Sequence, residues 1–195
     1  MKQVHETRES WLLALSEIFR GWFLEHSHTL PKVIRVSVGF PSRNALSTSN
    51  RSIGQCWYPD SARDGSTHIF ISPVIGDSLK VSDVLLHELV HSVVGPGVGH
   101  KGKFKQVATV MGLTGKMTAT EPSPELTRRL NGALKSLGPY PHAMLDPKKS
   151  PIKKQSTRLL KVECGDCGYT VRVTQKWIDV GLPTCPCGET MEQSE

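Results

Sequence analysis

The stretch at residues 84–94, VLLHELVHSVV, constrains the fold more than any other part of the chain. Two histidines and one glutamate interrupt a segment that is otherwise apolar, and Ser82 or Asp83 can cap the start of a helix over it. Gly95, followed by Pro and Gly, ends that helix. A helix that is apolar nearly all round is buried, and buried His and Glu side chains are costly unless they pair or bind a metal. The sequence therefore predicts a buried helix with either a metal site or a His/Glu hydrogen-bond network.

The spacing of the polar residues in this helix fits a zinc site. His87 and His91 are four residues apart, so both imidazoles lie on one helix face and can bind one Zn²⁺ at about 2.0–2.1 Å. Glu88 does not need to bind the metal and can take a proton from a zinc-bound water as a general base. The pattern indicates hydrolysis of a peptide bond, in which Glu88 then passes the proton to the leaving amine.

A catalytic zinc needs a third protein ligand, and its fourth position is left to water. The candidates in this sequence are His100, His68, His142 and Glu121. We favour His100, because the glycine-rich turn at residues 95–99 (GPGVG) can reverse the chain and return it to the metal. The alternative role for His100 is to cap the next helix.

The remaining periodicities predict a mixed α+β domain with a small antiparallel sheet. Apolar residues recur every three or four positions over residues 5–25, which indicates an amphipathic helix. Alternating or β-rich stretches predict three strands at residues 33–40, 53–58 and 67–72. Two further helices are expected at residues 102–112 and 124–137. The edge of the strand at 67–72 can pair with an extended peptide, although an ordinary sheet strand explains it equally well.

Four of the five cysteines fall within one short segment near the end of the sequence. Cys164 and Cys167 form a C-x-x-C pair, and Cys185 and Cys187 form a C-x-C pair at nearly zinc-ribbon spacing. A unit of this size cannot bury enough surface to fold alone, so a structural Zn²⁺ on four thiolates would supply the missing stability. The alternatives are a redox dithiol or two surface pairs. The fifth, Cys56, is expected to be a buried apolar residue.

Composition excludes several classes and divides the chain into three parts. No run of apolar residues is long enough to span a membrane, and the polar N-terminus does not fit a signal peptide, so we expect a cytoplasmic protein. The net charge of +6 divides into +4 over residues 1–146, +6 over 147–161 and −4 over 162–195. Residues 139–157 are proline-rich and show neither the helical nor the strand periodicity of apolar residues. The sequence therefore predicts a domain at 1–146, a basic linker at 147–157 and a zinc ribbon at 158–195.

The chain resembles the SprT-like (SprT/Spartan-like) zinc metallopeptidases. The resemblance rests on the segments DVLLHELVH at residues 83–91 and HKGKFK at residues 100–105, and one departure from the family pattern is the Lys101 inserted before Gly102. The family implies a minimal zincin-like catalytic fold, often followed by a zinc ribbon. It also implies that His87, His91 and His100 bind the catalytic zinc and that Glu88 is the base.

These observations lead to a first hypothesis and an alternative. The first is a zinc endopeptidase that acts on DNA-associated proteins in a bacterial or phage-infected cell and carries one catalytic and one structural Zn²⁺. The basic residues Lys148, Lys149, Lys153, Lys154, Arg158 and Lys161 would contact phosphates, and Trp177 or Tyr169 of the ribbon would stack on a base. A solvated linker and a purely structural ribbon explain the same residues. The alternative is a non-proteolytic nucleic-acid-binding or transcription-associated zinc protein, and a peptidase without a link to DNA is a third possibility.

Overall fold

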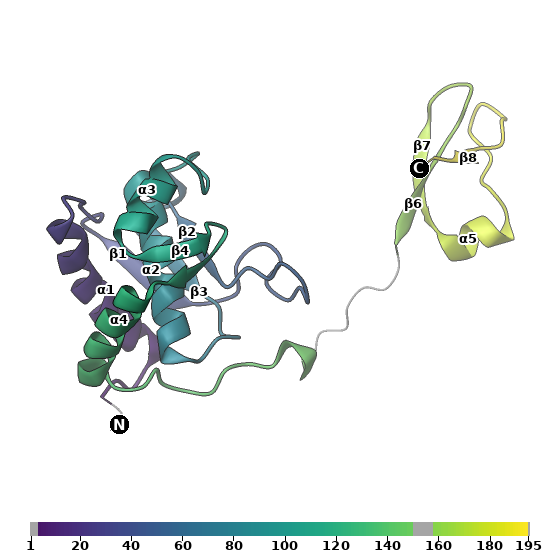
Figure 1. The fold of residues 1–195 in the computed structure, drawn as a ribbon. Helices are drawn as coiled ribbons and strands as arrows, with labels where there is room; N and C mark the ends of the chain where they lie inside the picture. The colour runs from purple at the N-terminus through teal and green to yellow at the C-terminus, as the bar shows by residue number, and fades with distance from the viewer. Residues whose placement is uncertain (1–3, 150–157, 195) are drawn as a thin grey trace. The chain divides into compact units, whose positions relative to one another are not determined.

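The computed structural model describes residues 4–149 and 158–194 (Figure 1). The chain forms two compact units, residues 1–148 and residues 149–195. The expected boundary at residue 146 lies close to this division, but most of the expected linker, residues 150–157 with Lys153 and Lys154, lies outside the described residues. Residues Pro147–Lys149 form a short 3-10 helix, η2. Among the described residues, no helix is both long and apolar enough to cross a membrane.

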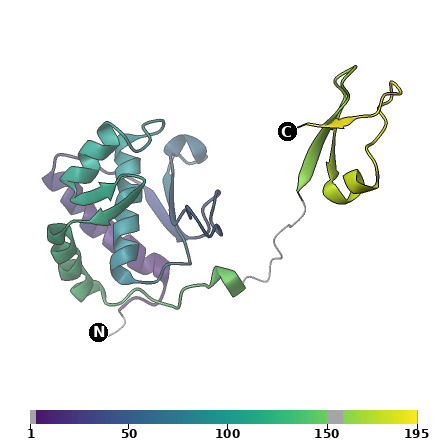
Figure 2. The same ribbon diagram turned by 45° about the vertical axis from the view of Figure 1, so that its right-hand side comes forward.

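In the described part of the first unit, four α-helices pack together, and the first two along the chain contact a small three-stranded sheet. Helix α1 (Arg8–Glu25) begins after Thr7, whose hydroxyl accepts a hydrogen bond from the backbone of Ser10, as expected for an N-cap. Most of its apolar stripe is buried, with Trp11, Leu15 and Phe19 fully so. Helices α2 (Ser78–Val94), α3 (Lys103–Val110) and α4 (Pro124–Leu137) complete the set. Helices α1 and α4 lie beside α2 (Figures 1 and 2).

The sheet consists of β1 (Ile34–Val38), β2 (Gly54–Trp57) and β3 (Thr67–Ile71), in the order β1-β3-β2. Strand β3 pairs parallel with β1 and antiparallel with β2. The prediction of an antiparallel sheet was therefore wrong for one of its two pairings. The reason is the long connection at residues 39–53. It lets β2 lie two strand positions away from β1, and β3 then inserts between them.

Helix α2 starts about one and a half turns earlier than the sequence predicted. Its N-cap is Asp77, whose carboxylate accepts a hydrogen bond from the backbone of Lys80 at 2.8 Å. The expected caps lie within the helix. Ser82 donates to the carbonyl of Ser78, and Asp83 is buried. Because Asp, like Ser, caps helices well, the sequence offered several equivalent starts, and the four residues after Asp77 continue the helix.

A β-hairpin between α3 and α4 was not predicted from the sequence. Its strands are β4 (Leu113–Lys116) and β5 (Ala119–Pro122), and they pair antiparallel. Gly112 precedes the hairpin with a φ of 86°, in the left-handed region that favours glycine. Helix α2 and helix α4 both contact β5, so the hairpin lies close to the helix that carries the HELVH sequence.

The segment after α4 is bound to the first unit, although its sequence reads as a linker. The Arg8 guanidinium donates to the carbonyls of Pro141 and Ala143, at 3.1 and 2.7 Å. The backbone of Leu145 donates to the carbonyl of Pro73. These bonds hold residues 141–145 against the first unit, although the segment forms neither helix nor strand. The proline-rich composition therefore indicates irregular structure here, and not a free linker.

The second unit is a small antiparallel sheet with one short helix. Its strands are β6 (Leu159–Glu163), β7 (Thr170–Thr174) and β8 (Glu192–Gln193), in the order β7-β6-β8. Helix α5 (Gln175–Val180), which the sequence did not predict, follows β7 directly. Among the residues of this unit that the structure describes, the buried side chains are Val162, Cys164, Cys185 and Met191. So small a core cannot by itself offset the conformational entropy lost on folding.

Candidate functional site

Three imidazole nitrogens converge on the surface of α2. The Nε2 atom of His100 lies 3.2 Å from Nε2 of His87 and 3.1 Å from Nε2 of His91. Each of the three residues offers a nitrogen that lies within 4.8 Å of the other two, so the group can hold a metal ion. Three nitrogens around a tetrahedral zinc stand about 3.3–3.4 Å apart, which is close to these two separations. The distances therefore fit a metal of this size.

The loop between α2 and α3 brings His100 to the two helix histidines. Gly95, Gly97 and Gly99 have φ values of 84°, 77° and 61°, and the turn requires this left-handed backbone at each of them. The backbone N–H of Gly95 donates to the carbonyl of His91 and closes the helix. Sequence reasoning expected this turn from the GPGVG pattern, and the described loop has that form.

The ring of Phe104 packs against all three imidazoles. This side chain is fully buried at the start of α3, and its ring centroid lies 5.0 Å from that of His87, 4.4 Å from that of His91 and 4.9 Å from that of His100. A rigid aromatic ring against each imidazole restricts the rotamers of the three histidines. The same residue belongs to the HKGKFK segment on which the family resemblance rests.

The hairpin supplies an outer contact to the first histidine. The Nδ1 atom of His87 lies 3.0 Å from Oγ1 of Thr120, a buried residue of β5. A neutral imidazole carries one N–H, so a bond from Nδ1 to Thr120 leaves Nε2 with its lone pair toward the other histidines. Thr120 could not be found from the sequence, because the hairpin that positions it was not predicted.

Electrostatics keep the three histidines neutral. Burial, followed by the nearby imidazoles, lowers the pKa of His87 to about 3. Burial and the neighbouring His100 lower the pKa of His91 to about 4, and burial lowers that of His100. A metal ligand must be unprotonated, so at neutral pH all three side chains are in the form that binds metal.

Glu88 occupies a space that strand β2 leaves open. Its side chain is 7% exposed, and burial raises its pKa to about 8, although the backbone N–H of Cys56 donates a hydrogen bond to the carboxylate. A Cβ atom on Gly54 would lie 2.9 Å from Cγ of Glu88 and 2.8 Å from Cγ1 of Val84. Glycine at this position of β2 therefore makes room for the carboxylate beside the histidines.

One cleft of about 640 Å³ contains the three histidines and Glu88. Residues 50–56 of β2 and the preceding loop line one side, and residues 116 and 118–121 of the hairpin line the other. Tyr58 also lines this cleft, and so does Cys56. Cys56 is half-buried, not the buried core residue that was expected, and burial raises the pKa of its thiol to about 12.

The prediction that the edge of β3 can pair with a peptide was wrong. Strand β3 is the central strand, with β1 on one side and β2 on the other. The edge strand beside the histidines is β2, which is paired only with β3 among the described strands. The error arises because the order of strands in the sheet differs from their order in the sequence.

The other candidates for a third ligand do not join the histidine group. His68 lies on β3 with Nε2 3.1 Å from Oγ of Ser66. His142 lies 3.0 Å from the carbonyl of Glu6 through its Nε2 atom. Glu121 lines the cleft but is not part of the metal-binding group that the described residues form.

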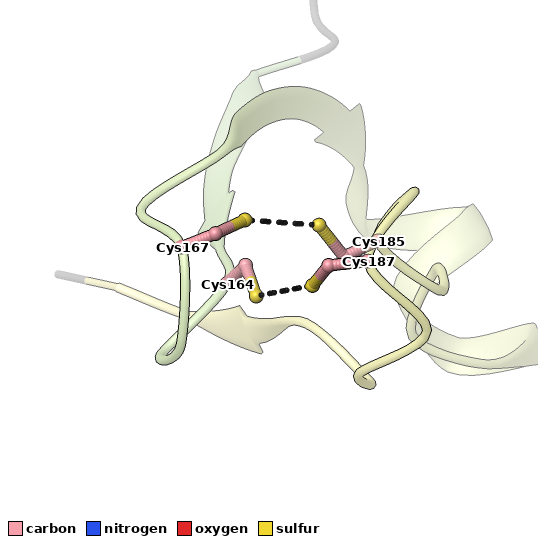
Figure 3. A group of neighbouring side chains, drawn as sticks. All are labelled: Cys164, Cys167, Cys185 and Cys187. Atoms are coloured by element: carbon pink, nitrogen blue, oxygen red, sulfur yellow. Dashed lines mark hydrogen bonds between the residues drawn. The ribbon is translucent and has the colours of Figure 1, made fainter.

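Four cysteines of the second unit form a separate group. Sγ of Cys164 lies 3.5 Å from Sγ of Cys187, and Sγ of Cys167 lies 3.4 Å from Sγ of Cys185. Figure 3 shows the four side chains pointing toward one another from two loops. The sulfurs are too far apart for disulfides, which have S–S bonds of about 2.05 Å, and near the roughly 3.8 Å expected around tetrahedral zinc. The C-x-C pair thus reaches the same point as the C-x-x-C pair.

The backbone of both loops turns back toward the sulfur atoms. Gly168 and Gly188 have positive φ values of 74° and 99°, and each follows a cysteine pair. Hydrogen bonds from the backbone N–H groups of Cys167 and Asp166 lower the pKa of the Cys164 thiol to about 7. Amide donors directed at a sulfur favour the thiolate, which is the form that binds a metal.

Comparison with known proteins identifies no relative: no family model, no curated protein and no solved structure matches the chain. The resemblance to the SprT-like peptidases therefore stays a prediction from the two sequence segments. The three neutral imidazoles beside a buried carboxylate in the first unit, and the four clustered thiols in the second unit, are observations about this chain itself.

Proposed function

We propose that the first unit is a zinc-dependent endopeptidase with a zincin-like site, in which His87, His91 and His100 hold the metal and Glu88 is the general base. The observation that carries the proposal is the convergence of the three Nε2 atoms in the cleft that also contains the buried carboxylate. Three protein ligands with a free fourth position are typical of catalytic zinc, whereas structural zinc has four.

Zinc at this position would supply Lewis-acid chemistry, polarising a peptide carbonyl and lowering the pKa of water. Glu88 takes the proton of the attacking water and delivers it to the nitrogen of the leaving amine. The charge of a bound zinc would favour the carboxylate form of Glu88, which is the form that accepts a proton. The hydrogen bond from the Cys56 backbone fixes the carboxylate while it does so.

Strand β2 offers a way to hold the substrate. The edge of β2 away from β3 borders the cleft. The N–H of Cys56 is bonded to Glu88, and the other main-chain groups of this edge can pair with an extended peptide and place a carbonyl beside the histidines. Such pairing recognises the main chain of the substrate more than its side chains, and it can bind an internal segment of a polypeptide. This supports an endopeptidase rather than an enzyme that removes terminal residues.

The test is the substitution Glu88→Gln in the full chain. We expect loss of cleavage of a mixed set of quenched fluorescent peptides, with zinc content and circular dichroism equal to those of the wild type. Glu125→Gln, which removes an exposed acid on α4, serves as the matched control. If the wild type and the Glu88→Gln variant give the same rates, the peptidase proposal fails and the non-proteolytic zinc protein becomes the better explanation.

We propose further that the four cysteines hold a structural zinc and that the substrates are proteins bound to DNA. The support for DNA is the charge of +6 over residues 147–161, together with the exposed rings of Tyr169 and Trp177 in the second unit. Replacing the lysines and the arginine of this segment by glutamine should weaken DNA binding and flatten its salt dependence. Unchanged binding would leave a peptidase without a link to DNA.

A further inference from the structure

The side chains of strand β2 alternate between two faces of the sheet. Gly54 faces α2, because a Cβ atom placed on it would meet Val84 and Glu88. Side chains two residues apart in a strand share a face, so Gln55 and Trp57 lie on the face away from α2. Trp57 is 39% exposed and does not line the cleft that contains the histidines. The strand that is proposed to hold the substrate therefore carries a large, accessible ring on its outer face.

The register of β2 shows which main-chain groups are directed toward a substrate. The N–H of Ser72 donates to the carbonyl of Ile53 at 2.9 Å, and this pair continues the antiparallel register of β2 and β3. In such a register, residues that bond across the two strands alternate with residues whose N–H and C=O point outward. The main-chain groups of Gly54 and Cys56 therefore point away from β3, in agreement with the bond from the Cys56 N–H to Glu88. The N–H of Gly54 and the two carbonyls are directed toward a peptide at this edge.

A surface hollow of about 420 Å³ lies beside Trp57. Its lining includes Trp57, Gln55 and residues 41–43 of the loop before β2. Ser52, Gly54 and Gln55 line both this hollow and the cleft, so the two spaces meet along β2. A peptide paired with the edge of β2 away from β3 continues the sheet and alternates its side chains in the same way. Its outer-face side chains then lie beside those of β2, within reach of the hollow.

The hollow offers the face of an aromatic ring. Gln55 is bonded to Ser42 at both ends of its amide, because Oε1 accepts from the Ser42 N–H and Nε2 donates to the Ser42 hydroxyl, both at 2.8 Å. No ring or cation of a described residue stacks on Trp57. Arg43 is the one charged residue in the described lining. A guanidinium attracts an aromatic ring and repels a basic side chain, so the hollow fits an aromatic residue.

A second hollow also borders Trp57, but it lies over the middle of the sheet. It is lined by His68 and Phe70 of the central strand β3 and by residues 61–64 of the loop before that strand. Among the described residues, it shares no lining residue with the cleft. The hollow with residues 41–43 is therefore the one that a peptide on β2 meets.

We propose that Trp57 and residues 41–43 form a subsite for an aromatic side chain of the peptide that β2 holds; this inference rests on the proposed function. The ring of a phenylalanine or tyrosine stacks on the indole in an offset or edge-to-face arrangement, which contributes beyond the apolar area that it buries. Because side chains alternate along an extended peptide, the aromatic residue neighbours a residue whose side chain points toward α2. Cleavage would then occur at a fixed distance along the chain from an aromatic residue.

The binding test uses the full chain with Glu88→Gln, which does not consume its peptides. The ligands are fluorescein-labelled Gly/Ser/Ala nonapeptides with phenylalanine, cyclohexylalanine, alanine or lysine at the central position, and fluorescence anisotropy gives their affinities. Cyclohexylalanine is at least as apolar as phenylalanine but has no aromatic ring. We expect the phenylalanine peptide to bind about threefold to tenfold tighter than the cyclohexylalanine peptide, because an aromatic pair contributes that much. The lysine peptide should bind no tighter than the alanine peptide.

Substitutions in the Glu88→Gln background locate the preference. Trp57→Leu keeps an apolar side chain without a ring and should bring the ratio of the phenylalanine and cyclohexylalanine affinities toward one, whereas Trp57→Phe should retain most of it. Phe40→Leu is the matched control, because Phe40 is an exposed ring close in sequence that does not line the hollow. Circular dichroism checks the fold of each variant. Equal affinities of the two peptides, absence of binding for all four, or a ratio unchanged by Trp57→Leu would overturn the subsite.

Cleavage by the wild type separates this inference from the proposed function. We expect mass spectrometry to show that the cleaved bond moves by one residue when the phenylalanine moves by one residue. This dependence should be lost when Trp57→Leu is made in the chain with Glu88 intact. Cleavage at bonds unrelated to the phenylalanine would refute the subsite alone, and a phenylalanine preference in binding without cleavage by the wild type would refute the peptidase alone.

Discussion

Gly54 and Glu88 are so close that only a residue without a side chain fits at the glycine. A Cβ atom on Gly54 would lie 2.9 Å from Cγ of Glu88, well inside normal van der Waals distance. Strand β2 and helix α2 therefore meet at the proposed base, and the position of the carboxylate depends on a glycine in the strand that is proposed to bind the substrate.

The substitution Gly54→Ala should lower peptidase activity without removing the metal. The methyl group would force Glu88 to move, and a misplacement of about 1 Å at a catalytic group can cost about 100-fold in rate. We expect kcat/KM to fall by about that factor while zinc content stays unchanged. Gly21→Ala is the control, because a Cβ on Gly21 meets nothing within 4 Å and alanine favours its helix. Wild-type kcat/KM in Gly54→Ala would contradict this account of the site.

The helix that carries the site could be predicted because its signals are local. Helical periodicity and the spacing of His87 and His91 depend on a few adjacent residues, and so does the glycine turn before His100. The same is true of α1 and of α4, which spans the predicted residues 124–137. These are features that neighbouring residues specify without the rest of the chain.

The parts that could not be predicted depend on residues far apart in the sequence. The pairing of β3 between β1 and β2 is set by which strand reaches the middle of the sheet, and no local pattern records that order. Thr120 meets His87 only through the hairpin, whose strands are four residues long and largely polar. The buried state of Asp83 likewise follows from packing, because its sequence position suggested a helix cap.

The metal-free protein should be most stable near pH 6.5. Between pH 4.5 and 8 the folded chain keeps on Glu88 a proton that the unfolded chain has lost, so stability falls as the pH rises. Between about pH 4 and 6.5 the unfolded chain holds protons on His87 and His91 that the folded chain lacks, so stability rises. The histidine effect prevails below pH 6.5, and in the first unit the proton held by Glu88 then lowers the free energy of unfolding by about 2 kcal/mol up to pH 8.

Urea unfolding of chelator-treated protein at several pH values measures this profile. Glu88→Gln has no proton to lose, so the decline above pH 6.5 should become nearly flat in that variant. Glu125→Gln should retain the decline. If Glu88→Gln declines as steeply as the wild type, the carboxylate does not hold its proton in the folded metal-free chain.

Replacing Thr120 should weaken zinc binding without touching a ligand. Valine keeps the shape of threonine but offers no acceptor for Nδ1 of His87, so the imidazole loses its fixed orientation. Outer contacts of this kind are worth about 10–100-fold in metal affinity. We expect that loss in Thr120→Val and recovery in Thr120→Ser, measured by competition with a chromophoric chelator. Zinc held by the cysteines provides an internal reference, and an unchanged affinity in Thr120→Val would exclude the positioning role.

The two metal sites should be lost independently, because they lie in separate compact units. We expect two zinc ions per chain, falling to one in His87→Ala and to one in Cys164→Ala. The consequences should differ: the first unit has a large apolar core and should stay folded without zinc, whereas the second has few buried side chains and should unfold. Metal analysis with limited proteolysis measures both, and Cys56→Ser is the control for loss of a thiol. One zinc ion in the wild type, or a protease-resistant second unit in Cys164→Ala, would contradict the assignment of a structural site.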